Sequence, residues 1–188
     1  MNRIIYFSLI LVFSVGCKRN RPSHKIDGEP TIRESIVVNS DNKVIKENVP
    51  SISNILSVKV IRILDGDTIE ILYDQLSIKL RLAHIDAPEK RGKQAFGNNA
   101  KKALSDLCYG QMVKVHSDGE FDRNGRLIGV IYNNQGLNLN KEMVRLGMAW
   151  HYKKYSDDQS YDSIEREARA AKTGLWQDPS PIAPWDYR

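Results

Sequence analysis

The chain has 188 residues, enough for one ordinary domain with extensions, and 41% of them are apolar, enough to build a packed core. With 27% charged residues and a mean hydropathy of −0.45, the composition indicates a soluble domain and excludes a chain built mainly of membrane-spanning segments. The net charge of +5 suits a polyanionic partner without specifying one, and the two cysteines and four histidines form no zinc-binding pattern.

The first 17 residues carry the features of an export signal. Arg3 provides a positive start, the apolar run 4–15 is too short to span a bilayer, and small residues before Cys17 suit a cleavage point. This segment also resembles a bacterial lipoprotein signal, in which Cys17 is lipidated and inserts its chains into a membrane. We therefore expect an exported protein, either a lipid-anchored protein of the cell envelope or, if Cys17 is incidental, a secreted one.

Residues 18–54 are predicted to be a flexible linker, because polar and charged residues dominate them and no apolar period is sustained. The pattern changes near residue 55, and the folded domain is expected over residues 55–178. A tail follows over residues 179–188, and its three prolines predict that it is not helical.

Alternation of apolar and polar residues predicts five short strands. The first two flank an Asp-Gly-Asp turn, and the third places Arg81 between Leu80 and Leu82, so that its two faces differ in chemistry. The last two strands are expected over residues 112–117 and 127–132.

Apolar residues recurring at helical spacing predict three helices. The last of them should turn Ile164, Ala168 and Ala171 inward. A helix between the third and fourth of five strands is the element order of an OB-type barrel. We therefore predict an α+β fold, a five-stranded OB-type β-barrel with three helices. The helices are expected over residues 95–108, 138–146 and 160–173.

Three acidic residues lie at the ends of predicted strands. Asp67 follows the tight turn, and Asp86 and Glu89 come just after the third strand. If the first three strands form a meander, Asp67 and Asp86 lie at the same end of neighbouring strands, and two converging carboxylates suit a hard cation such as Ca²⁺. Each piece also has a purely structural reading, since Asp-Gly-Asp is a common turn and Asp86 with Glu89 can form a helix-capping box.

Two arginines accompany these acids. Arg81 lies five residues before Asp86 on the polar face of its strand, and Arg126 follows a turn. Two guanidiniums aimed at one phosphate would neutralise the charge that grows during phosphoryl transfer. A basic turn residue is often only solvated, so the combination of acids and arginines carries the functional hypothesis.

Several sequence runs, taken in this order, resemble the active-site and structural motifs of the staphylococcal nuclease (thermonuclease) family, and the resemblance covers about residues 56–178. The later structural motifs are Leu146-Gly147-Met148-Ala149 and Gly174-Leu175-Trp176. The active-site runs are Asp65-Gly66-Asp67-Thr68, Arg81-Leu82-Ala83-His84-Ile85-Asp86-Ala87-Pro88-Glu89 and Asp122-Arg123-Asn124-Gly125-Arg126.

The resemblance implies roles for six of these residues. Asp67 and Asp86 would bind Ca²⁺ through their carboxylates, and Ala87 would bind it through its backbone carbonyl. Glu89 would orient or deprotonate the attacking water. The scissile phosphate would be held by the arginines at positions 81 and 126.

Three positions bear on how far the resemblance extends. Asn124 stands where the best-known member has a tyrosine that contacts the terminal phosphate, and His84 fills a place often held by glycine. Tyr155 falls where the family has a ring that stacks on a base, and Lys153 and Lys154 add charge beside it.

The resemblance implies a Ca²⁺-dependent endonuclease that acts on DNA and RNA, prefers single strands and leaves 3′-phosphate ends, and we expect it to be a monomer. Two alternatives come from other classes. One is a non-catalytic OB-type module that binds single strands, and the other is an adhesin or structural lipoprotein that uses the barrel as a scaffold. Neither needs Glu89 or the two arginines beside the acids.

Overall fold

The computed structural model describes residues 32–38, 44–50 and 54–188, with side chains from residue 55 onward. Strands β1 (Ile32–Val38) and β2 (Val44–Pro50) pair antiparallel as a hairpin inside the predicted linker. The hairpin is local order that the sequence pattern did not indicate, and the spacer role of the segment stays a prediction. Cys17 and the predicted export signal lie outside the described residues.

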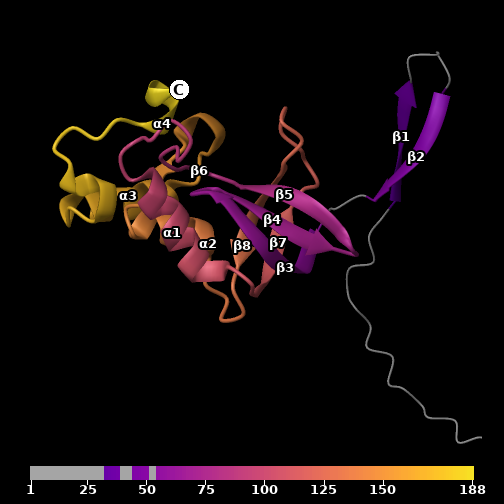
Figure 1. Ribbon diagram of the computed structural model, residues 1–188, viewed down its shortest axis with the longest axis horizontal. Coiled ribbons are helices and arrows are strands. Elements are labelled where there is room, and N and C mark those ends of the chain that lie inside the picture. The colour runs from indigo at the N-terminus through magenta and orange to yellow at the C-terminus, as the bar shows by residue number, and fades with distance from the viewer. Residues whose placement is uncertain (1–31, 39–43, 51–53) are drawn as a thin grey trace, which may run out of the picture.

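Five strands close into a barrel in the order β3-β4-β5-β8-β7 (Figure 1). All neighbours pair antiparallel except β5 and β8, which run parallel with Arg81 opposite Ile128. The predicted α+β fold with a five-stranded OB-type barrel is confirmed. The strands are β3 (Asn54–Asp65), β4 (Thr68–Tyr73), β5 (Leu76–Leu82), β7 (Met112–Ser117) and β8 (Leu127–Tyr132).

The barrel core follows the alternation read from the sequence. Ile69 and Ile71 of β4 are buried, as are Leu80 and Leu82 of β5, while Arg81 between them points to the other face. Burying one such aliphatic side chain stabilises a fold by about 1.5–3 kcal/mol. The same alternation that builds the core therefore fixes which face of β5 carries the arginine.

Three main helices gather at one end of the barrel (Figure 1). Helix α1 (Gly97–Cys108) buries Ala100, Leu104 and Cys108 at four-residue spacing. Cys108 is a free, buried thiol that donates to the carbonyl of Leu104, and burial raises its pKa to about 12. It therefore acts as a small apolar core residue.

Helix α2 (Leu139–Arg145) begins at Asn138, whose side chain caps it, and helix α3 (Gln159–Ala170) begins at Asp158 in the same way. In α3 the buried side chains are Tyr161, Glu165 and Ala168, with Ile164 partly buried. The prediction that Ala171 turns inward is wrong, because the helix ends one residue earlier and leaves Ala171 exposed.

The tail prediction also needs correction. Residues Pro184–Tyr187 form a short helix, α4, although the prolines predicted a non-helical tail. Proline is tolerated in the first turn of a helix, where its missing N–H has no intrahelical partner to lose, and Pro184 occupies that place. Among the described residues, no helix is both long and apolar enough to cross a membrane.

The remaining elements are short strands and 3₁₀ helices. Strand β6 (Ile85–Asp86) pairs with β9 (Trp150–His151), and two 3₁₀ helices follow, η1 (Lys153–Tyr155) and η2 (Gly174–Gln177). Trp150 and Trp176 meet edge to face in a second buried cluster. Both tryptophans therefore have a packing role.

Two glycines, Gly147 and Gly174, allow the end of α2 and the start of η2 to meet. Gly147 has a φ of +61°, and a Cβ on it would lie 2.1 Å from the carbonyl oxygen of Thr173. The amide of Leu175 donates to the carbonyl of Gly147 at 2.8 Å. The contact leaves no room for a side chain.

We predict that Gly147→Ala lowers the free energy of unfolding by about 3 kcal/mol or more, because it combines left-handed strain with a backbone clash. Gly136→Ala is the matched control, since Gly136 also has positive φ but a Cβ added to it would meet no atom within 4 Å. It should lose only about 1–2 kcal/mol. Urea unfolding of both variants measures the difference, and equal losses would contradict the packing argument.

Candidate active site

The Asp-Gly-Asp turn between β3 and β4 packs tightly beneath helix α1. A Cβ placed on Gly66 would lie 2.7 Å from the Cβ of Ala100 and 2.8 Å from that of Ala87. This close approach brings Asp67 to the chain after β6, where the amide of Ala87 donates to Asp67 Oδ2 at 2.9 Å. The predicted convergence of the two strand ends is therefore present.

A single guanidinium links the two carboxylates. Arg81 Nη1 lies 3.0 Å from Asp67 Oδ2, and Arg81 Nη2 lies 2.7 Å from Asp86 Oδ1. The Arg81 side chain is only 12% exposed. Charge-assisted pairs of this kind are short and directional, so Arg81 fixes the positions of the two carboxylates relative to each other.

Asp86 is the most buried of the predicted site residues, with no exposed surface. Burial raises its pKa to about 6, and the neighbouring Asp67 charge adds to this, while Arg81 and Arg188 oppose it. Desolvation and the repulsion by Asp67 together thus outweigh the attraction of two guanidiniums. A carboxylate in this environment gains from any further positive charge.

Arg126 is linked to Asp67 through the hydroxyl of Thr68. Its Nε donates to Asp122 Oδ2 at 2.7 Å, and its Nη1 donates to Thr68 Oγ1 at 3.2 Å. The Thr68 hydroxyl in turn donates to Asp67 Oδ1 at 2.8 Å. Asp122 therefore orients the guanidinium, and the Thr68 hydroxyl bridges it to the Asp67 carboxylate.

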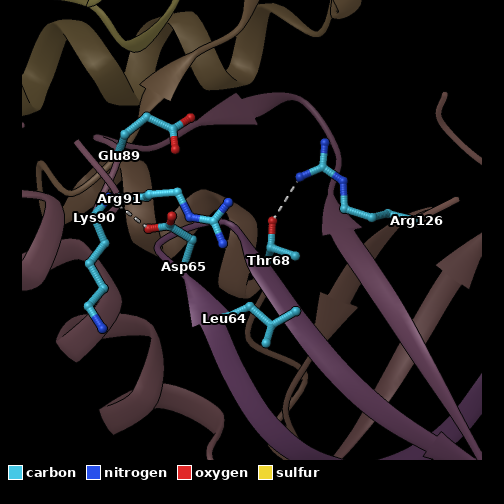
Figure 2. A pocket seen from close by; sticks show the side chains of 7 residues that line it. All are labelled: Leu64, Asp65, Thr68, Glu89, Lys90, Arg91 and Arg126. Atoms are coloured by element: carbon cyan, nitrogen blue, oxygen red, sulfur yellow. Dashed lines mark hydrogen bonds between the residues drawn. The ribbon is translucent and has the colours of Figure 1, made fainter. Parts of the chain in front are cut away.

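Glu89 and Arg126 line one open pocket of about 510 Å³ (Figure 2). Thr68 lies on its wall, and Lys90 and Arg91 add two further basic groups. A pocket with three cationic side chains and two carboxylates, Asp65 and Glu89, suits an anion together with a group that can accept a proton. The complete lining is Leu64, Asp65, Thr68, Glu89, Lys90, Arg91 and Arg126.

Hydrogen bonds and ion pairs join all five charged residues predicted for the site. Glu89 connects to Asp86 through Arg188, whose guanidinium pairs with both carboxylates. The connected chain runs through Arg126, Thr68, Asp67, Arg81, Asp86, Arg188 and Glu89.

The donor set suits a hard cation. Asp67, Asp86 and the carbonyl of Ala87 would offer only oxygen ligands, which Ca²⁺ prefers, with water or substrate completing six to eight positions. Within the side chains that the structure describes, no three His, Cys, Asp or Glu residues gather as a metal cluster. The protein would therefore supply two carboxylates and one carbonyl, and the two carboxylates are already shared with Arg81.

The three residues predicted for substrate binding lie outside the pocket lining. Lys153 pairs with Asp162 at 2.5 Å, and Lys154 lies over the ring of Tyr155 at 5.5 Å from its centroid. Tyr155 is 68% exposed, so one large ring is open to solvent on η1. They form a separate basic and aromatic surface.

His84 packs against the fold. Its φ of +67° explains why glycine suits this position, and its carbonyl accepts from the amide of Tyr152 at 2.8 Å. The ring lies 5.1 Å from that of Tyr161, and burial lowers its pKa. These contacts give His84 a structural role.

Two residues near the site were not predicted. Asn140 is fully buried, accepts from the amide of Ile131, and donates to the carbonyls of Ala83 and Gly129. It thereby fixes the chain that leaves β5 just after Arg81. Arg188 lies 102 residues from Asp86 in sequence, and no motif marks it.

Comparisons with known proteins agree with the geometry. A family model described as staphylococcal nuclease homologue matches residues 79–178. A micrococcal nuclease of Shigella flexneri is 45% identical over 141 residues, covering 69% of this chain and 79% of that protein. An uncharacterized endonuclease of Haemophilus influenzae is 48% identical over 131 residues, covering 69% of this chain and 71% of its own length.

The raised pKa of Asp86 predicts a specific pH dependence of stability. Because the folded protein holds this proton more tightly than the unfolded chain, the contribution of Asp86 is fully favourable below about pH 4 and is lost as pH rises through about 6. In chelator, the free energy of unfolding of wild type minus that of Asp86→Asn should fall by on the order of 1–3 kcal/mol across this window.

Urea unfolding of both proteins at pH 4, 5, 6 and 7 measures this difference. Groups that do not interact with Asp86 titrate equally in the two proteins, so they cancel. A difference that grows with rising pH would mean that the guanidiniums outweigh burial at Asp86.

Proposed function

Because the chain belongs to the staphylococcal nuclease family and is therefore a nuclease that acts on nucleic acid, we propose that it is a Ca²⁺-dependent endonuclease that cuts DNA and RNA and leaves 3′-phosphate ends. The observation that carries this proposal is the set of two carboxylates, two guanidiniums and Glu89 linked by hydrogen bonds and ion pairs, with Glu89 and Arg126 lining one pocket. The nuclease-named relatives favour an enzyme over the non-catalytic binding module and the structural scaffold.

The two arginines are proposed to hold the scissile phosphate. Each guanidinium has five N–H groups, and about three of these are used by protein partners at Arg81 and at Arg126, so both keep donors for a phosphate. Asp122 fixes the orientation of Arg126. Preorganised donors aimed at a phosphoryl group stabilise the charge that develops on its oxygens without reorganisation during the reaction.

Glu89 is proposed to take the proton of the attacking water. Its carboxylate faces the pocket that Arg126 also lines, and Gln94 holds its backbone amide at 2.9 Å. A positioned general base contributes about 10²–10⁴-fold to a rate. The proposed base and Arg126 therefore line one cavity.

Asp67, Asp86 and the carbonyl of Ala87 are proposed to hold Ca²⁺, which when bound would polarise a phosphoryl oxygen as a Lewis acid. The burial of Asp86 and its repulsion by Asp67 support this, because a divalent cation would relieve both. Arg81 then keeps the two acids at the spacing that the ion requires.

A preference for single strands is proposed to come from η1. The exposed ring of Tyr155 can stack on an unpaired base, which is worth about 1–3 kcal/mol per base and tolerates any sequence. Lys153 and Lys154 add positive charge beside the ring, where a phosphate backbone would pass.

We propose that the enzyme acts as a monomer outside the cytoplasm. The pattern of residues 1–17 supports export, and Cys17 supports a lipid anchor in the cell envelope, with a secreted form as the alternative. In the anchored form, residues 18–54 would serve as the spacer between membrane and barrel.

We predict that Glu89→Gln lowers kcat for cleavage of single-stranded DNA in Ca²⁺ by about 10²–10⁴-fold, because the amide cannot accept a proton. Single-turnover cleavage assays with Ca²⁺ and with chelator measure this, and binding of the DNA by the variant serves as the control. Near-wild-type rates in Glu89→Gln would remove Glu89 from the chemistry, and equal cleavage in chelator would remove the calcium requirement.

We predict that Arg81→Lys lowers kcat/KM by about 100-fold or more, because a point charge cannot bridge two carboxylates and a phosphate as a planar fork does. Arg62→Lys is the matched control: Arg62 pairs with Glu70 at 2.6 Å on the barrel surface and is 62% exposed. It should keep kcat/KM within about twofold. Equal effects of the two substitutions would contradict the proposed role of Arg81.

A further inference from the structure

Arg188 lies between two acids of the proposed site. Its Nη2 pairs with Asp86 Oδ2, and its Nη1 lies 2.5 Å from Glu89 Oε1. Arg81 takes the other oxygen of Asp86, so both oxygens of this fully buried carboxylate are held by guanidiniums. Arg188 thus connects the proposed metal ligand to the proposed base.

The tail that carries Arg188 is anchored at several points. The hydroxyl of Tyr187 donates to the carbonyl of Gly92 at 2.7 Å. The ring of Trp185 stacks on that of Tyr152, with centroids 5.2 Å apart and planes inclined by only 2°. Stacked aromatic rings add about 0.5–1.5 kcal/mol beyond their buried area, so α4 is held at a defined place.

Gln94 joins the tail directly to the loop of the proposed base. Its side chain is buried, its Oε1 accepts from the amide of Glu89 at 2.9 Å, and its Nε2 donates to the carbonyl of Ile182 at 2.8 Å. One side chain therefore sets the position of both Glu89 and the segment that leads into α4. The placement of Arg188 opposite Glu89 is built into the fold.

The direction of the Arg188 donors distinguishes an arginine that binds phosphate from one that neutralises carboxylates. Both terminal nitrogens point to carboxylates, and Arg188 does not line the pocket that Arg126, Lys90 and Arg91 share. A phosphate-binding arginine would turn donors toward that pocket. A guanidinium placed on Asp86 and Glu89 instead neutralises the negative charge of the buried Asp86, which a divalent cation would also neutralise.

We propose that Arg188 is an internal competitor of the divalent cation. Its guanidinium must leave Asp86 before Ca²⁺ binds, and it must leave Glu89 before Glu89 can accept a proton. The inference rests on the proposed calcium site. Because the Arg188 side chain is 43% exposed, it can swing into solvent while Trp185 and Tyr187 stay docked. The device keeps Asp86 and Glu89 neutralised when calcium is scarce and raises the calcium concentration at which the site fills.

Calorimetric titration of Ca²⁺ into the full chain without substrate tests this competition. Arg188→Gln should bind Ca²⁺ about 5- to 50-fold more tightly than wild type, because no guanidinium has to be displaced. Arg91→Gln is the matched control, since Arg91 lines the pocket and loses the same charge, while the guanidiniums paired with Asp86 and Glu89 belong to Arg81 and Arg188. It should change the affinity by about twofold or less, as expected of a screened charge.

A spectroscopic readout tests the motion itself. The Arg188 side-chain N–H signal, assigned by its loss in Arg188→Gln, should shift toward that of a solvated arginine as Ca²⁺ is added to the wild type. An unchanged signal at saturating Ca²⁺ would overturn the competition even if the affinities differed.

Each remaining outcome is decisive. Wild-type calcium affinity in Arg188→Gln would overturn the inference while leaving the calcium site intact, and weaker DNA binding in that variant would then assign Arg188 to the phosphate. An equal gain in both variants would reduce Arg188 to a general charge effect. Absence of calcium binding in wild type and variants alike would overturn the proposed function itself.

Discussion

The site depends on one buried guanidinium placed between two carboxylates that come from different strand ends. Asp67 and Asp86 would repel each other in this low-dielectric setting, and Arg81 contacts both at 2.7–3.0 Å. The pKa of Asp86 still rises to about 6, chiefly because of its burial. The ion pairs with Arg81 therefore do not fully offset the cost of burying Asp86, and the barrel core supplies the stability that the charged cluster does not.

The barrel makes this arrangement possible through its closure. The parallel pairing of β5 with β8 places Arg81 beside the strand that follows Arg126, and Asn140 fixes the chain just beyond β5. Gly66 lets the Asp-Gly-Asp turn approach Ala87 closely enough for the hydrogen bond to Asp67. Rigid elements thus hold the acids, while Glu89 and Arg126 lie on loops at the open pocket.

Local patterns predicted most of the fold and the convergence of Asp67 and Asp86, while the resemblance to the nuclease family implied the grouping of these acids with Glu89 and the two arginines. Alternation at Leu80 and Leu82 fixed the face of Arg81, and four-residue spacing identified α1. Helix α4 was missed because proline marks both helix starts and non-helical chain. Arg188 was missed because its contacts span 102 residues, a separation at which sequence periodicity carries no information about proximity.

A crystal structure of the protein grown with Ca²⁺ tests the central claim most directly, because the anomalous signal locates the ion independently of any assay. The account predicts one strong peak about 2.3–2.6 Å from oxygens of Asp67, Asp86 and the Ala87 carbonyl, with Arg81 still beside both acids. A peak bound elsewhere, or ordered water at this position at saturating Ca²⁺, would contradict it.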